Sequence, residues 1–266
     1  MTAAAAPVST LPVTAARRVP QGGFSGTLLR LEIRRLLRNR RTLILGVLMP
    51  AVFFFLFGGQ AYTDESAGRG NVSAYVMISL MVYGAMLSTT SGGASVAIER
   101  AQGWSRQLRL TPLNPLAYIA TKAISAMVLG GLSILVAMAA GAVGGARMTA
   151  WVWVAAALIA WVGSLVFSAF GLFVGYLLPS ENVMQLLGPA LALLAFLGGL
   201  FVPLGQLGGT FQTVAEFTPA YGVGALARLP LTGDALTVAP VANVVIWTAL
   251  FALGAAWRFR RDTARV

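Results

Sequence analysis

Six apolar stretches, each about 20 residues long or longer, constrain this chain more than any other feature. About 20 apolar residues form a helix long enough to cross the hydrocarbon core of a bilayer. Only 10% of the 266 residues are charged, whereas a soluble domain carries about 25%. The pattern therefore predicts an all-α integral membrane protein with six transmembrane helices. The stretches cover about residues 42–59, 73–98, 116–145, 151–178, 183–203 and 236–257.

The basic residues flank these stretches unevenly. All but three of the 19 arginines and lysines lie before the first stretch, between the second and third or, for Lys122, near the start of the third, or near the C-terminus. The exceptions, Arg69, Arg147 and Arg228, lie in the alternate loops. Cytoplasmic loops are rich in arginine and lysine, so both termini are predicted to be cytoplasmic. The net charge of +11 then matches anionic membrane lipids and not nucleic acid, because the basic residues border apolar stretches.

The N-terminal region changes character at Phe24. Residues 1–23 lack helical periodicity and are predicted to be a disordered cytoplasmic tail, which leaves 24–266 as one transmembrane domain. From about Phe24 to Arg41, leucine and isoleucine gather on one side of a helix and arginine on the other. This pattern predicts an amphipathic helix lying along the membrane surface; the alternative is an ordinary basic flank that sets topology. The arginines of the polar side are Arg30, Arg34, Arg38 and Arg41.

The segment between the second and third stretches, IERAQGWSRQLRLTPLNP, is neither apolar nor low in complexity. Glu99 and Arg100 are expected to end the second span at the water boundary, and Gly103 offers a break. Residues 105–110 are expected to form a short helix, and Pro115 to begin the third span. A short helix held between two spans is a lever for a partner protein. The alternative is a loop that only sets the topology.

Several functional classes are excluded or disfavoured by residues that are missing. The chain has neither histidine nor cysteine, so no metal site or disulfide is predicted. Its one lysine, Lys122, lies in TKAIS and not in the G-x-x-x-x-G-K-[ST] loop that binds ATP phosphates. The expected role of Lys122 is an anchor near the inner surface. An intramembrane hydrolase would need it as the base of a serine–lysine pair. No substrate-binding residue stands out from the apolar spans.

With these features together, the chain resembles the transmembrane subunits of ABC-2 type exporters, the permease class found beside bacterial drug and antibiotic efflux ATPases. The resemblance covers nearly all of the chain after Phe24. It implies an elbow helix at about 24–41, a coupling helix within 99–111, and a partly re-entrant outer segment at about 204–236. The motifs that carry it are RLEIRRLLRNRRTLIL, IERAQGWSRQLRLTPLNPLAYIATK, FLGGLFVPL and FTPAYGVGALAR.

The resemblance also implies a function and partners. A separate ATPase subunit, which binds ATP and Mg, would drive export of a drug, antibiotic, lipid or peptide from the bacterial plasma membrane. Two permease copies, identical or closely related, would form the pathway, and this chain would bind no cofactor. A scaffold or immunity protein that recruits an ATPase without transport remains the alternative, followed by the hydrolase. The residues expected to contact the ATPase are Glu99, Arg100, Gly103, Ser105, Arg106, Leu108 and Arg109.

Overall fold

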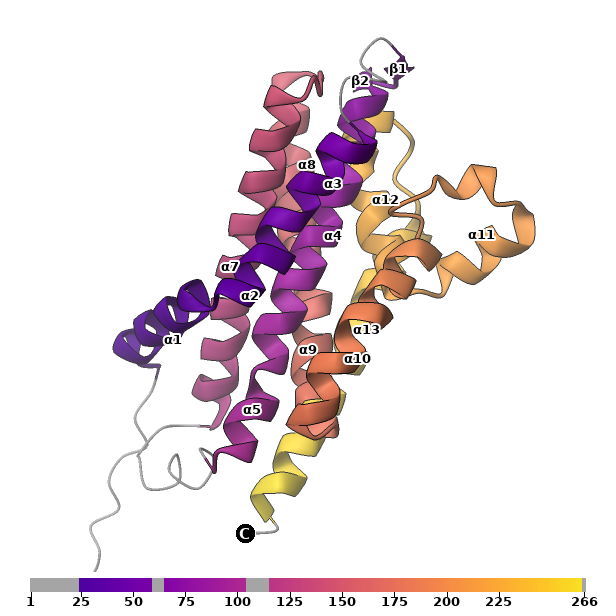
Figure 1. The fold of residues 1–266 in the computed structure, drawn as a ribbon. Helices are drawn as coiled ribbons and strands as arrows, with labels where there is room; N and C mark the ends of the chain where they lie inside the picture. Colours follow the sequence, from indigo (N-terminus) through magenta and orange to yellow (C-terminus); the bar gives the residue numbers. More distant parts are fainter. Residues whose placement is uncertain (1–23, 59–64, 104–114, 265–266) are drawn as a thin grey trace, which may run out of the picture.

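The computed structural model describes residues 24–58, 65–103 and 115–264, and it is an elongated helical bundle (Figure 1). Six helices are long and apolar enough to cross a membrane, which confirms the predicted all-α membrane protein. Five of them lie within a few residues of their predicted positions. The six are Arg40–Phe57, Val72–Ala101, Leu116–Val143, Ala150–Leu177, Ser180–Leu197 and Val238–Arg261.

Three of the spans consist of more than one helical piece. The bundle contains α1 (Gly26–Arg38), α2 (Arg40–Thr42), the π-helical η1 (Leu43–Leu48), α3 (Met49–Phe57), α4 (Val72–Ala94), α5 (Val96–Ala101), α7 (Pro115–Val143), α8 (Ala150–Gly163), α9 (Leu165–Leu177), α10 (Ser180–Leu197) and α13 (Val238–Ala264). The first span joins α2, η1 and α3; the second joins α4 and α5; the fourth joins α8 and α9. Helix α7 begins at Pro115, as predicted.

The irregular first span is explained by Pro50. Proline has no backbone N–H, so the carbonyl of Gly46, four residues earlier, loses its helical donor. Ser133 Oγ, on α7, donates to that carbonyl at 2.8 Å. A neighbouring helix thus satisfies the polar group that proline frees, which a membrane interior requires.

Helix α4 lies at the centre of the bundle and packs backbone to backbone against α9 (Figure 1). A Cβ atom added to Gly171 would lie 2.3 Å from the carbonyl oxygen of Thr90, and one added to Gly93 would lie 2.6 Å from that of Ser168. Thr90 Oγ1 also donates to the Phe167 carbonyl at 3.3 Å. The small and hydroxyl residues of the second span therefore serve helix packing.

The fifth span ends earlier than predicted. The apolar pattern continues to Pro203, but α10 ends at Leu197 because Gly198 caps it and Gly199 takes a φ of 72°. A left-handed glycine after the last turn is a common way to end a helix. The chain then leaves the bundle axis, so the apolar residues after Leu197 do not extend the span.

The segment after this break, predicted to be partly re-entrant, contains η3 (Leu204–Gln206), α11 (Gly209–Glu216) and α12 (Pro219–Thr232). Figure 1 shows α11 projecting from the bundle and α12 running back along it. Helix α12 packs against α8, α13 and α4. Arg228 lies in the connection between the fifth and sixth spans, as the basic-residue pattern predicted, but it is buried within α12 and not exposed in a loop. How deeply α11 and α12 enter a membrane stays a prediction.

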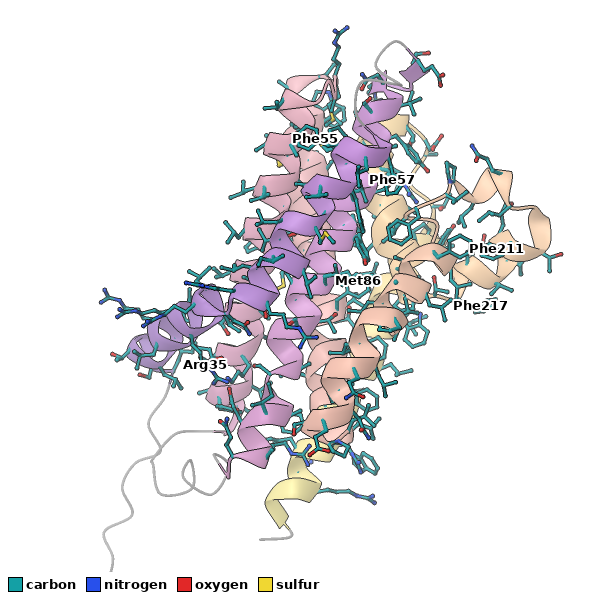
Figure 2. All side chains as sticks on the ribbon, in the orientation of Figure 1. Arg35, Phe55, Phe57, Met86, Phe211 and Phe217 are labelled. Atoms are coloured by element: carbon teal, nitrogen blue, oxygen red, sulfur yellow. The ribbon has the colours of Figure 1, made fainter. Side chains whose placement is uncertain are left out.

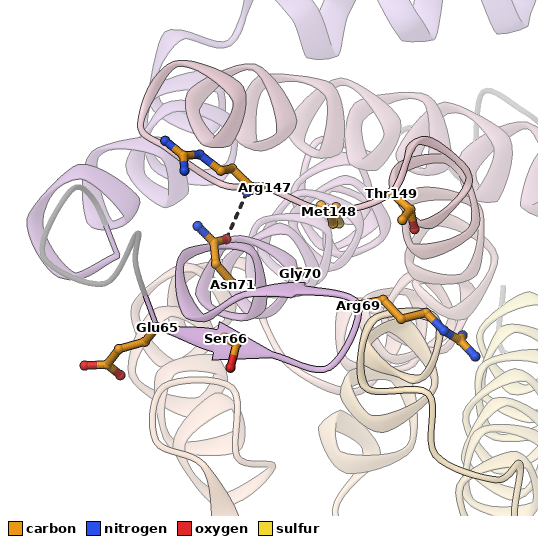
Figure 3. A pocket seen from close by; sticks show the side chains of 8 residues that line it. All are labelled: Glu65, Ser66, Arg69, Gly70, Asn71, Arg147, Met148 and Thr149. Carbon is orange, nitrogen blue, oxygen red and sulfur yellow. Dashed lines mark hydrogen bonds between the residues drawn. The ribbon is translucent and has the colours of Figure 1, made fainter.

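A small hairpin of β1 (Ser66–Ala67) and β2 (Gly70–Asn71) closes the end of the bundle opposite α5 (Figure 1). Its Asn71 Oδ1 accepts from the backbone N–H of Arg147 at 2.9 Å and of Ala74 at 3.0 Å. Figure 3 shows this contact at the edge of a pocket of about 470 Å³. One side chain thus caps α4 and joins the loop after the first span to the loop after the third.

Candidate functional site

The structure describes both ends of the predicted coupling segment. Glu99 and Arg100 lie in α5. Gly103, with a φ of 73°, is the last residue that the structure describes before residue 115. The third span then begins at Pro115. The remaining residues predicted to contact an ATPase lie outside the described residues: Ser105, Arg106, Leu108 and Arg109.

Glu99 is the centre of a buried ionic cluster and is only 3% exposed. Its Oε1 accepts hydrogen bonds from Lys122 Nζ and, at 2.5 Å, from Arg35 Nη1. Its Oε2 accepts from the hydroxyl of Tyr118. Glu99 does lie at the end of the second span, as predicted, but its carboxylate is buried and does not face water. A carboxylate can be buried here because two cations and a hydroxyl replace its hydration.

Lys122 supplies the second half of the cluster. It is 2% exposed, and its Nζ also donates to Glu32 Oε1 at 2.6 Å. Arg35 lies 3.7 Å from the other oxygen of Glu32. The ammonium group of Lys122 thus lies between two carboxylates and does not reach solvent, and its position near the inner surface of a membrane stays a prediction. Two cations and two anions make the cluster electrically balanced, which limits the penalty for removing them from water.

Three helices meet in this cluster: α1 contributes Glu32 and Arg35, α5 contributes Glu99, and α7 contributes Tyr118 and Lys122. Figure 2 shows Arg35 where α1 approaches the bundle. Because α5 and α7 flank the predicted coupling segment, the cluster ties both of its flanks to α1.

The amphipathic pattern of α1 explains how Glu32 reaches the cluster. Glu32 and Leu36, one helical turn apart, are the buried residues of α1, while Arg30, Arg34 and Arg38 are exposed. The predicted separation of faces is therefore present. The helix ends at Asn39, whose side chain caps the next helix by accepting from Thr42 N–H at 3.3 Å. Arg41 consequently belongs to the first span and not to α1.

Arg100 fixes the same end of the second span to a fourth helix. Its Nη1 donates to the backbone carbonyls of Gly175 at 3.0 Å and Tyr176 at 2.9 Å. Its guanidinium also lies 5.8 Å from the ring of Tyr176. These carbonyls are at the C-terminal end of α9, where the helix dipole favours a cation. Glu99 and Arg100 thus connect α5 to α1, α7 and α9.

The chemistry of the cluster is structural and electrostatic. Lys122 Nζ is bound by two carboxylates, so it is not placed to accept a proton from a serine hydroxyl, as a hydrolase would require. Burial alone would lower the pKa of Arg35, but the Glu99 and Glu32 carboxylates hold that pKa above its usual value. Arg35 therefore stays charged at physiological pH. Within the described ranges, no group of three acidic residues is placed to hold a metal ion.

Sequence reasoning missed Glu32, Arg35 and Tyr118 as members of a site and assigned Lys122 another role. One signal was available: Glu32 is the only acidic residue among the arginines of α1, and it lies four residues before Leu36 on the apolar side. A lone carboxylate on an apolar face needs a buried cation. Lys122 is the only lysine in the chain, but nothing in the sequence joins the two.

Comparisons with known proteins agree with this architecture. The sequence profile of the ABC-2 type transporter family matches residues 25–228. A protein of Bacillus subtilis (strain 168) named "Putative transport permease YvfS" is 27% identical over 235 residues, which cover 88% of this chain and 96% of that protein. The match includes α1, the ionic cluster and five of the six spans. The chain belongs to the ABC-2 type transporter family and is a multi-pass transmembrane subunit of an ABC transporter.

Proposed function

We propose that this chain is the permease subunit of an ATP-driven exporter in the bacterial plasma membrane, with both termini in the cytoplasm. The solute is hydrophobic or amphiphilic, in keeping with spans built mainly from leucine, alanine, valine and glycine. Two copies, or one copy and a close relative, surround the pathway. Drug, antibiotic, lipid and peptide are the candidate cargoes.

The ionic cluster is the observation that carries the proposal. It holds α5 and α7, which flank residues 104–114, against α1 through contacts of Glu99 and Lys122. Force applied to that segment by a partner would move these helices together, because separating buried opposite charges is costly. Helix α5 continues α4 as one span, so movement at the segment would reach the opposite end of the bundle.

Energy comes from a separate ATPase subunit that binds ATP and Mg and docks on residues 99–111. In keeping with this, Lys122 is held by Glu32 and Glu99 and is not free to bind a phosphate. Glu99 and Arg100 position the docking segment through α1 and α9, and Ser105, Arg106, Leu108 and Arg109 supply its contacts with the ATPase.

The test is Glu99→Gln, with Glu181→Gln as the matched control because Glu181 is an exposed carboxylate in α10. The complex is purified from the native membrane, and retained ATPase, ATP hydrolysis and solute efflux are measured. We expect Glu99→Gln to reduce efflux by about tenfold, a typical coupling effect, while membrane insertion and the control stay unchanged.

Three outcomes would each overturn a part of the proposal. A native chain that never retains an ATPase would contradict the transporter function itself. A chain that retains the ATPase but moves none of the candidate solutes would be a scaffold or immunity protein. Unchanged efflux by an assembled Glu99→Gln complex would remove the cluster from the coupling role.

A further inference from the structure

An open groove of about 500 Å³ lies along an exposed face of α1. Leu31, Arg34, Arg35, Arg38 and Asn39 line it. These residues follow the spacing of one helix face, since positions three, four and seven residues apart lie side by side. The groove ends at Asn39, the cap of the first membrane-spanning helix. It therefore places cationic groups beside the start of the first membrane span at Arg40.

The positive charge of the groove is only partly neutralised. Arg34 and Arg38 form no ion pair with any carboxylate in the described part of the chain. Arg35 pairs with Glu99 through Nη1, yet its side chain is still 48% exposed. A guanidinium has five N–H donors, so most of those of Arg35 are left for another acceptor. Three like charges within about one helical turn repel each other, and a bound anion would relieve this repulsion.

From this geometry we infer that the groove binds the phosphate of an anionic lipid from the adjacent leaflet. Arg34 and Arg38, four residues apart, donate to the phosphate oxygens, because guanidinium groups form paired hydrogen bonds with phosphate. Arg35 adds charge from the bundle side. The acyl chains extend from the phosphate along the neighbouring apolar surface.

The apolar surroundings favour a lipid over a soluble phosphate. Leu31, which lines the groove, is 58% exposed. Ile44, Leu45 and Leu48, near the start of the first span, are also exposed. A lipid anchored by its phosphate at Asn39 would cover these side chains with its hydrocarbon. A soluble phosphate would contact only the polar groups of the groove and none of this apolar surface.

Arg35 links this site to the ionic cluster. Its guanidinium lines the groove and donates to Glu99, so a bound phosphate and Glu99 would share the same cation. Lipid composition should then influence the coupling segment, a consequence that rests on the proposed function. Lipid binding itself does not depend on an ATPase and can be measured on the full chain alone.

The experiment compares Arg34→Gln/Arg38→Gln with Arg30→Gln/Arg41→Gln. The second pair removes the same charge from exposed positions nearby that do not line the groove. The full chain is placed in vesicles of phosphatidylcholine with or without phosphatidylglycerol, extracted, and analysed for retained lipid by native mass spectrometry. We expect the groove variant to retain phosphatidylglycerol about tenfold more weakly than the native chain, and the control variant to retain it normally.

Arg34→Lys/Arg38→Lys separates geometry from charge and is expected to give intermediate retention, because lysine lacks the paired donors of arginine. Equal losses in both glutamine variants would overturn the site in favour of general surface attraction. Displacement of the lipid by millimolar inorganic phosphate would assign the groove to a soluble anion. Unchanged lipid retention together with lost ATPase co-purification would assign it to an acidic protein surface.

Discussion

The two ends of the bundle bury charge in different ways. At the end that carries the coupling segment, Lys122 and Arg35 are matched by Glu32 and Glu99. Toward the hairpin end, Arg228 is only 6% exposed and forms no ion pair with a described carboxylate. One site balances charge with charge, whereas the other surrounds a charge with dipoles.

Arg228 is stabilised by polar groups from two elements. Its Nη1 donates to Ser79 Oγ at 3.1 Å and to the Gly199 carbonyl at 2.9 Å, and its guanidinium lies 5.0 Å from the ring of Tyr75. These contacts tie α12 to α4 and to the turn after α10. The two sites therefore differ in what the loss of a cation leaves behind. Removing Lys122 would leave a buried, unpaired carboxylate near α5, whereas removing Arg228 would leave only neutral polar groups near α12.

The largest effect is expected for Lys122→Met. Both Glu32 and Glu99 would lose their shared cation while staying buried, and we expect the free energy of unfolding to fall by about 3–5 kcal/mol. Unfolding in mixed micelles measures this. Combining the change with Glu32→Gln should recover part of the loss, because one unpaired charge is then removed. A double variant that simply adds the two single losses would show that the cluster does not act as a unit.

A smaller effect is expected for Arg228→Met. The variant loses two hydrogen bonds and leaves the Gly199 carbonyl unpaired, but it also removes a buried charge. We expect a loss of about 1–2 kcal/mol in the free energy of unfolding, measured in the same micelles. A loss as large as that of Lys122→Met would break the comparison, since it would mean that dipoles stabilise Arg228 as strongly as carboxylates stabilise Lys122.

The smallest effect is expected for Tyr118→Phe. It removes the hydroxyl that donates to Glu99 Oε2 and keeps both cations of the cluster. The expected loss is about 1 kcal/mol in the free energy of unfolding, typical of one hydrogen bond. A loss several times larger would show that Tyr118, and not Lys122, makes the strongest interaction with Glu99.

Local features of the fold were predictable from the sequence. The number of spans follows from the length of the apolar stretches, and the start of α7 at Pro115 follows from the position that proline prefers in a helix. The end of α10 was missed, although Gly198 and Gly199 were visible. Glycine permits a break without requiring one, and apolar residues on both sides hid it.

The candidate site was only partly predictable. Glu99 and Arg100 do lie at the end of the second span, as predicted, and the coupling role of the residues that follow stays a prediction. The surroundings of Glu99 and Arg100 were not foreseen, because a charge at the end of an apolar stretch normally meets water. The partners of Glu99 come from α1 and α7, and helical periodicity does not say which neighbouring helix a face will meet.

Thus the sequence alone determined the membrane class, the six spans and the segment between the second and third, because apolar length and helix-ending residues act over short distances along the chain. Tertiary structure alone decided which charges meet. Glu32 and Lys122 are 90 positions apart, and Arg228 is buried only because α12 folds back against α4. The reason is physical: buried charges are stabilised by whatever polar groups packing brings near them, and packing joins distant parts of the chain.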